Sequence, residues 1–300
     1  LTCFAVRNRF ASRRLWKWPL IVAAAIPALM VSAGSSPARV ARSSPIQVTT
    51  SGVVLTVNPD SNSVSLLSGA SKLAEIAAGR NPETLSLSAD ERFAYVASRD
   101  DDSISIIDID RRALVNSAAV CREPFAAVRQ GERLYVSCMG DAIVAVIDVE
   151  SLERIDVIPT EIDPRGLALW NERLLVTHFT SGKVTVIDTR SHVIEKVIDT
   201  LADANLSQAI WIDEARQMAL LPQTRSNSSN RALLFDTTVF PIVSAIDLQT
   251  LQNVPARRVS IDVADRPVGI PIDAVVTGEG LLWIVNAASN DISVISLESG

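Results

Sequence analysis

Cysteine, histidine and aromatic residues are scarce in this sequence of 300 residues, which holds 3 Cys, 2 His, 5 Trp, 2 Tyr and 7 Phe. The two histidines form neither a His-x-x-x-His zinc pattern nor a set of two histidines and one carboxylate at metal-ligand spacing. Cys-x-x-Cys-His, Gly-x-x-x-x-Gly-Lys and Gly-x-Ser-x-Gly are also missing, which excludes c-type haem attachment, a phosphate-binding loop and a nucleophile elbow within this segment. We therefore assign it no catalytic residue, metal ligand or cofactor, and we do not expect the segment by itself to be an enzyme.

Glycine and proline are few as well, at 12 and 14 residues, which excludes collagen-like and low-complexity chains. Hydrophobic residues make up 48% of the sequence and charged residues 21%, so the chain is not disordered. Because aromatic residues are rare, aliphatic side chains must build the core.

Positive charge is concentrated at the N-terminus. Residues 1–33 contain five basic residues and no acidic one, whereas the remaining sequence has 23 basic against 34 acidic residues. Because such an acidic surface repels phosphate groups, nucleic acid is not an expected partner.

The basic N-terminus runs into an uncharged stretch at residues 18–33 that holds two prolines. Sixteen residues are short for a bilayer span, which needs about 20, but they suit the core of a signal peptide. Val31-Ser32-Ala33 offers the small residues that a signal peptidase reads. We expect a signal peptide at residues 1–33, a flexible lead-in at 34–51, and a periplasmic or cell-surface protein without a stable membrane span after cleavage. An uncleaved anchor is the alternative, and Arg13-Arg14 leaves Sec or twin-arginine export open.

An internal repeat of about 40 residues organises the rest of the chain. Residues 103–108 return as 143–148 and again as 183–188, so that the closing aspartates stand 40 residues apart. Two further series of residues recur at similar intervals. One is Leu55, Tyr95, Tyr135 and Leu175, and the other is the prolines Pro82, Pro124 and Pro164.

Each unit divides into short β-type runs separated by turn residues. In the third unit the runs are residues 125–129, 133–138, 143–148 and 154–158, with no room for a crossover helix between them. Four antiparallel strands in about 40 residues are typical of a β-propeller blade. The sequence therefore predicts an all-β propeller over residues 52–300, with about 5.5 to 6 blades of four strands.

Three segments resemble the Tyr-Val-Thr-Asn signature of the YVTN-type β-propeller repeats: Tyr95-Val96-Ala97-Ser98, Tyr135-Val136-Ser137-Cys138 and Trp283-Ile284-Val285-Asn286. The Ser/Thr-Val-Ile-Asp ending of the next strand agrees with that family, whereas its usual Pro-Asp-Gly turn is absent. The resemblance covers about residues 52–300 and implies an exported propeller of the seven-bladed type, without implying an activity.

The repeat becomes irregular after Asp188, because the next markers, Asp247 and Ser296, follow after 59 and 49 residues. We place the extra residues of the first of these long intervals in an insertion at residues 222–240, between the second and third strands of the fifth unit. Long loops inside compact repeats are often functional.

The loops after the second and fourth strands of antiparallel blades emerge on the same side, and we predict the binding site on that loop-rich face. Arg80 and Arg122, at the ends of fourth strands, also belong to it. The candidate residues for contact with a ligand or partner are Arg99, His178, Gln223, Arg225, Asn227, Arg231 and Asn286. For His178 a structural hydrogen bond is the alternative.

The repeated aspartates stand where a strand enters a hairpin, so we expect them to accept backbone N–H groups two or three residues on, rather than to bind calcium. Cys121 and Cys138 end a fourth and the following second strand, and both reach the loop-rich face. Export supplies an oxidising compartment, so we predict a disulfide, with two buried free thiols as the alternative.

Two hypotheses for the function follow. The first is a non-catalytic exported propeller that binds a protein or small ligand on its loop-rich face. The alternative is the propeller portion of a periplasmic c-type cytochrome redox protein, with a cytochrome domain as partner and its haem domain beyond residue 300. It rests on residues 221–227 and 235–238, which resemble the insertion of YVTN-type propellers joined to c-type cytochrome domains. A propeller lactonase would need inward carboxylate and Asn ligands that the sequence does not place.

The repeat begins at a second strand, although residues 46–50 could supply an inner one, and its last strand, at residues 293–297, is a third strand. Propellers avoid exposed strand edges by closing the ring. We therefore expect the ring to be incomplete at the C-terminus and the gene product to continue to seven blades.

Overall fold

The computed structural model describes residues 41–226, 239–261 and 269–298, all within one compact unit that spans residues 38–300. These residues form short β-strands and single-turn 3-10 helices. Their apolar runs are brief, rich in β-branched residues and bounded by turns, a combination that favours strands over helices.

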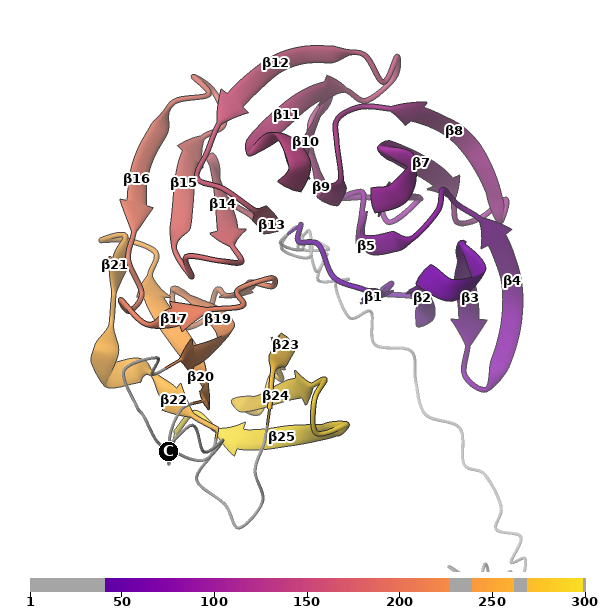
Figure 1. The fold of residues 1–300 in the computed structure, drawn as a ribbon. Coiled ribbons are helices and arrows are strands. Elements are labelled where there is room, and N and C mark those ends of the chain that lie inside the picture. The colour runs from indigo at the N-terminus through magenta and orange to yellow at the C-terminus, as the bar shows by residue number, and fades with distance from the viewer. Residues whose placement is uncertain (1–40, 227–238, 262–268, 299–300) are drawn as a thin grey trace, which may run out of the picture. The chain divides into compact units, whose positions relative to one another are not determined.

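The strands pair into six antiparallel sheets, called blades 1 to 6 below. Blade 1 contains β1 (Ile46–Val48), β2 (Val53–Asn58), β3 (Ser63–Ser68) and β4 (Ser71–Ala77); blade 2 contains β5 (Pro82–Leu87), β6 (Phe93–Ser98), β7 (Ser103–Asp108) and β8 (Ala113–Ala119). Blade 3 contains β9 (Pro124–Gln130), β10 (Arg133–Cys138), β11 (Ile143–Asp148) and β12 (Arg154–Pro159); blade 4 contains β13 (Pro164–Trp170), β14 (Arg173–His178), β15 (Val184–Asp188) and β16 (Ile194–Ile198). In Figure 1 the inner strands β5, β9 and β13 lie toward a common centre and β8, β12 and β16 lie outermost.

Blades 5 and 6 are less regular. Blade 5 contains β17 (Ala204–Asn205), β18 (Trp211–Asp213), β19 (Met218–Ser226), β20 (Val239–Asp247), β21 (Gln252–Asn253) and β22 (Val259–Ser260), with the 3-10 turn η4 (Pro255–Arg257). Blade 6 contains β23 (Pro271–Val276), β24 (Leu281–Asn286) and β25 (Asp291–Ser296).

The predicted all-β propeller with four-stranded antiparallel blades is confirmed, and the described residues form six blades rather than seven. The insertion expected at residues 222–240 is shorter than predicted, because Pro222–Ser226 continues β19 and pairs with β20. On the side of β19 away from β20, β18 pairs with Met218–Leu220 and β17 with Thr224 and Arg225, so Pro222 lies where β19 has an edge.

The tight turns of the first three blades repeat one backbone conformation. The 3-10 turns η1 (Pro59–Ser61), η2 (Arg99–Asp101) and η3 (Met139–Asp141) each end on a left-handed residue, namely Asn62, Asp102 and Ala142, all with φ of 54°. These residues stand 40 positions apart, so the repeat fixes the turns as well as the strands. Asn and Asp adopt this conformation readily, whereas Ala does so at a cost of about 1 kcal/mol.

The core consists of five hydrophobic clusters among the described residues, and each cluster joins one blade to the next in sequence. Blades 2 and 3, for example, share Tyr95, Ile104, Leu134 and Val136 in one cluster. Because both faces of a blade are buried, the strands are apolar in continuous runs rather than in strict alternation.

Part of the segment predicted as a flexible lead-in is held in place. Residues 41–45, here called the strap, bond to inner strands: Ser43 N donates to Leu167 O at 2.9 Å, and Ser44 exchanges two backbone hydrogen bonds with Leu85. β1, which follows the strap, is the inner strand of blade 1. The strap differs from a free lead-in because its polar backbone is paired and Ser43 and Ser44 are buried.

Candidate functional site

The loop-rich face is organised by a repeated clamp between an arginine and an aspartate. Arg80 donates its backbone N–H and its Nε–H to Asp101, and Arg122 donates the same two groups to Asp141 at 3.0 and 2.8 Å. Both arginines are therefore paired with the 3-10 turn of their own blade rather than free. These ion pairs are exposed, so each adds little to stability and mainly orients its turn.

Closer to the centre, the residue after each unit-opening proline forms an inner rim. Glu83 follows Pro82, Phe125 follows Pro124, and Arg165 follows Pro164, each at the start of an inner strand. Arg99 and Phe179, which directly follow β6 and β14, contact this rim: Arg99 pairs with Glu83 and Phe179 contacts Arg165. These five residues, Glu83, Arg99, Phe125, Arg165 and Phe179, are called the inner-rim cluster below.

Aromatic rings and hydrogen bonds hold the Arg165 guanidinium. Its Cζ atom lies 3.6 Å from the centroid of the Phe179 ring and 5.2 Å from that of Phe125. Nε pairs with Asp163 at 3.2 Å, and Nη1 donates to Gln208 Oε1 at 3.2 Å. Such cation–π contacts contribute about 0.5–2 kcal/mol and immobilise a cation that is still 19% exposed.

Glu83 is the acidic member of the cluster. Its carboxylate lies 3.1 Å from Arg99 Nη1. Burial raises the pKa of Glu83, and the positive charges of Arg99 and Arg165 oppose that rise only in part. The Arg99 side chain remains 41% exposed. The cluster thus presents two cations, a partly desolvated carboxyl and two aromatic rings, which together can contact a polar or ionic group of a ligand or partner.

Three residues at the end of second strands serve a common structural role. Asn58 Nδ2 donates to Ser65, His178 Nε2 lies 2.8 Å from Thr185 Oγ1, and Asn286 Nδ2 donates to Ser293. Each partner stands seven residues on, in the neighbouring third strand. His178 and Asn286 are buried, so they do not belong to the inner-rim cluster.

Burial also lowers the pKa of His178, and its Nδ1 lies 3.2 Å from the carbonyl of Ile162. The imidazole is therefore held between two partners, Thr185 and the Ile162 carbonyl. This is the structural hydrogen-bonding role that the sequence left open as the alternative to ligand contact.

The remaining candidates lie in or near the fifth blade. Gln223 is fully buried and donates to the Gly182 carbonyl at 2.6 Å, while Arg225 pairs with Asp203 at 2.8 Å. That pair raises the pKa of Arg225 and lowers the pKa of Asp203 through the same hydrogen bonds. Asn227 and Arg231 lie outside the described residues. Of the predicted residues, only Arg99 belongs to the inner-rim cluster.

Cys121 and Cys138 form a disulfide, with their Cα atoms 5.9 Å apart. Cys138 occupies the second-strand end that Asn58, His178 and Asn286 occupy in other blades, and the residue seven positions on is Ala145, which offers no hydrogen bond. A covalent bond to the linker before β9 thus takes the place of the hydrogen bond used elsewhere.

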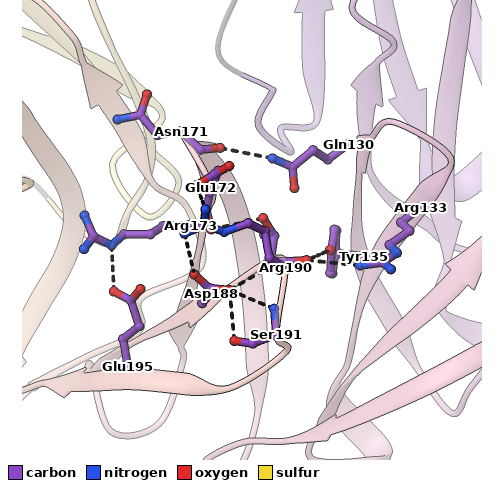
Figure 2. A network of polar contacts seen from close by, with 11 residues as sticks. Gln130, Arg133, Tyr135, Asn171, Glu172, Arg173, Asp188, Arg190, Ser191 and Glu195 are labelled. Atoms are coloured by element: carbon purple, nitrogen blue, oxygen red, sulfur yellow. Dashed lines mark hydrogen bonds and ion pairs between the residues drawn. The ribbon is translucent and has the colours of Figure 1, made fainter.

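The opposite face carries the hairpin turns with the repeated aspartates, and Figure 2 shows the turn of Asp188. Asp188 Oδ1 accepts hydrogen bonds from Arg190 N, Ser191 N and Ser191 Oγ at 2.8–3.0 Å. Asp148 and Asp247 repeat this arrangement, and hydrogen bonds from the backbone, led by that of residue i+3, lower the pKa of all three carboxyls. The turn-capping prediction is confirmed.

Between blades 3 and 4 this face has a groove of about 540 Å³, whose walls are tied together by polar contacts. Tyr135 Oη donates to the Thr189 carbonyl at 2.9 Å, and Gln130 Nε2 donates to the Asn171 carbonyl at 3.1 Å (Figure 2). These bonds join the two blades, so the groove is a seam between sheets.

Within the described ranges, no group of three or more His, Cys, Asp or Glu residues could hold a metal ion. Along the same ranges, no helix has the length and apolar character needed to cross a membrane.

The sequence pointed to the correct prolines but not to the residues after them. Glu83, Phe125 and Arg165 differ in chemistry, so no repeated residue type marks the inner rim. Their common signal is position, one residue after each marker proline. The close approach of the Gln208 segment to Arg165 also requires a glycine at position 166. A Cβ at Gly166 would stand 2.6 Å from the Gln208 carbonyl oxygen.

No protein-family model matches the sequence, and a sequence search of curated proteins finds no match. Solved structures are similar in fold. Hydrazine synthase of Kuenenia stuttgartiensis aligns over 84% of this chain and 76% of its own, with 18% identity and a TM-score of 0.75. The dihydro-heme d1 dehydrogenase NirN aligns over 72% of this chain and 49% of its own, with 14% identity and a TM-score of 0.50. The β-propeller domain of Myceliophteria thermophila Cps50 (Swd1) aligns over 85% and 97%, with 12% identity and a TM-score of 0.52. At these identities the likeness establishes the propeller fold alone.

Proposed function

We propose that this protein is a non-catalytic, exported β-propeller that binds a protein or small ligand on its loop-rich face, at the inner-rim cluster. One observation carries the proposal: Arg165 is fixed between two phenylalanine rings beside the partly buried carboxyl of Glu83. Preorganised cations and rings lose little entropy on binding, which suits recognition.

Export is part of the proposal, and the Cys121–Cys138 disulfide supports it, because such bonds persist in oxidising compartments. The basic residues and apolar stretch of residues 1–33 support it independently. N-terminal sequencing of the protein isolated from its native cells is expected to begin near Gly34. A sequence that begins upstream of residue 18 would contradict cleavage.

A photo-crosslinking amino acid at position 99 tests the binding site in native cell envelopes. Position 190 is the matched control, since Arg190 is also an exposed arginine paired with an acid, on the opposite face. We expect a reproducible adduct from position 99 that is absent from position 190. Once the adduct is identified, Arg99→Ala and Arg165→Met are expected to weaken its binding and Arg190→Ala to leave it unchanged. Equal adducts at both positions, or none at position 99, would contradict the site.

A second candidate is the propeller portion of a periplasmic c-type cytochrome redox protein whose haem domain lies beyond residue 300. The structural likeness to NirN, a dihydro-heme d1 dehydrogenase, favours this candidate. It predicts a Cys-x-x-Cys-His motif in the reading frame after residue 300 and a haem absorption band in the protein purified from native cells. A reading frame without that motif would remove it, while leaving the binding proposal intact.

A further inference from the structure

The two arginines of the inner-rim cluster have more hydrogen-bond donors than the protein itself uses. Arg99 donates its Nε–H to Asp100 at 3.3 Å and its Nη1–H to Glu83 at 3.1 Å. Arg165 uses the same two groups for its own partners, both at 3.2 Å. Among the described residues, neither arginine donates a hydrogen bond from Nη2. A guanidinium has five N–H donors and no acceptor atom, so the cluster can take an additional acceptor.

A carboxylate of the protein itself already occupies part of the cluster. Glu83 accepts the Nη1–H of Arg99, and its side chain is 22% exposed. Burial raises the pKa of Glu83, the positive charges of Arg99 and Arg165 oppose that rise, and the negative charge of Asp100 adds to it. The Glu83 carboxylate is therefore an internal competitor for the donors of Arg99, and it takes up a proton more readily than an exposed glutamate does.

The strap lies beneath the cluster. It bonds to Leu85 and Leu167, which stand two residues after Glu83 and Arg165 in β5 and β13. Two residues of a strand span about 7 Å, so the strap crosses between the inner strands one such step away from the cluster. In Figure 1 the segment before β1 extends to β13. A ligand therefore approaches the cluster from the loop-rich face.

We propose that the inner-rim cluster recognises a carboxylate group of its ligand, which bonds to Arg99 and Arg165 while Glu83 takes up a proton from the solvent. This inference rests on the binding site proposed above and adds the chemistry of the ligand. The carboxylate of the ligand replaces that of Glu83 as the acceptor at Arg99, and it also accepts from Arg165. Once neutral, Glu83 no longer repels the ligand and can donate its own O–H. The rings of Phe125 and Phe179, beside Arg165, contact the apolar part of the ligand.

The coupling gives the affinity a defined pH dependence. Two carboxylates at one site repel each other, so the bound anion favours the protonated form of Glu83. By linkage, the ligand binds more tightly as the pH falls toward the pKa of Glu83, which burial raises. A ligand that bound through a neutral group would not show this dependence on Glu83.

Isothermal titration calorimetry of the protein isolated from its native cells, with benzoate as the probe, tests the inference. Benzoate stays ionised between pH 5.5 and pH 8, because ordinary carboxyl groups titrate at about pH 4. We expect it to bind about tenfold more tightly at pH 5.5 than at pH 8, with a binding enthalpy that depends on the buffer because a proton is taken up. Benzyl alcohol, which has the ring without the carboxylate, is expected to bind about tenfold more weakly than benzoate at pH 5.5.

Glu83→Gln gives a readout that misfolding cannot imitate, because binding should improve. The amide cannot become charged, so this variant is expected to bind benzoate at pH 8 as tightly as the wild type does at pH 5.5, without pH dependence. Glu172→Gln is the matched control. It removes the same charge on the opposite face, where Glu172 pairs with Arg190 at 2.9 Å, and it should behave as the wild type does.

The outcomes separate the carboxylate from the binding site itself. Unchanged or weaker benzoate binding by Glu83→Gln, a wild-type pH profile in that variant, an equal gain in Glu172→Gln, or equal binding of benzyl alcohol would each overturn the inference. Absence of benzoate binding together with a crosslinked adduct at position 99 would remove only the carboxylate. Absence of that adduct would remove the proposed site.

Discussion

At the scale of single residues, the second-strand end is one position that several chemistries fill. Asn58, His178 and Asn286 each bond a hydroxyl seven residues on, and Cys138 forms the disulfide instead. These four residues each tie the loop to the blade, whereas the Oγ of Ser98, at the same position of blade 2, has no hydrogen-bond partner. We therefore expect the position to accept Asn in place of His178.

The first prediction concerns the pH dependence of stability. Burial lowers the folded-state pKa of His178 below its ordinary 6.5. Below that pH the unfolded chain takes up a proton that the folded chain does not, so stability falls as the pH falls through this range. His178→Asn is expected to lose less stability between pH 8 and pH 5.5 than the wild type, measured by urea unfolding. His192 is present in both proteins and cancels in the difference, and parallel pH profiles would contradict the prediction.

The second prediction concerns Gly79, which packs against the second-strand end of blade 2. A Cβ at Gly79 would stand 2.6 Å from Ser98 Cβ and 2.7 Å from Ser103 Oγ. Gly79→Ala is expected to destabilise the protein by about 1–3 kcal/mol, because the linker that holds Gly79 must move away from β6 and β7. Gly278→Ala is the matched control, with nothing within 4 Å of its new Cβ. Chemical denaturation measures both, and equal effects would contradict the close contact.

At the scale of elements, the disulfide fastens blade 3 to the linker that precedes it. It closes a loop with a sequence separation of 17 residues between Cys121 and Cys138, both buried. Reduction is expected to lower the free energy of unfolding by about 3 kcal/mol, the value for a loop of this length. The measurement is urea unfolding of mature protein with and without reductant. In a Cys121→Ala, Cys138→Ala variant the reductant should have no effect, and an effect there would point to another cause.

How much the sequence could predict depends on whether an element repeats. The strand segments and the hairpin aspartates recur every 40 residues, so periodicity alone predicts them. The propeller class follows from that repeat. The inner-rim cluster does not recur in chemistry, since Phe179 meets Arg165 only through the folding of blade 4. The strap is still less predictable, because Ser44 and Asp273 are 229 residues apart in sequence.

At the scale of the whole unit, the strap ties four blades together near their inner strands. Its backbone bonds to blades 2 and 4, Arg42 Cζ lies 4.5 Å from the centroid of Trp211 in blade 5, and Arg42 pairs with Asp273 of blade 6 at 3.1 Å. Arg42 and Asp273 are 11% and 12% exposed, so the pair is largely shielded from water.

Asp273→Ala is expected to destabilise the protein by about 3 kcal/mol, because it leaves the Arg42 cation buried without its partner. We also expect hydrogen exchange to become faster in β23 and β24 and to remain unchanged in β10 and β14. The double variant Arg42→Met, Asp273→Ala is the control, since it removes both charges and should recover part of the lost stability. Uniformly faster exchange in all blades would show that the strap does not act locally on blade 6.

The strap also has a consequence for the order of folding. Residues 41–45 are synthesised before all six described blades, yet their partner Asp273 is made more than 200 residues later. Contacts of such long sequence separation form late, because the intervening chain must first be ordered. We therefore expect the strap to bond first to the inner strands of blades 2 and 4 and to close its contacts with Asp273 last. The buried pair of Arg42 and Asp273 would then form only after the sixth blade has been synthesised.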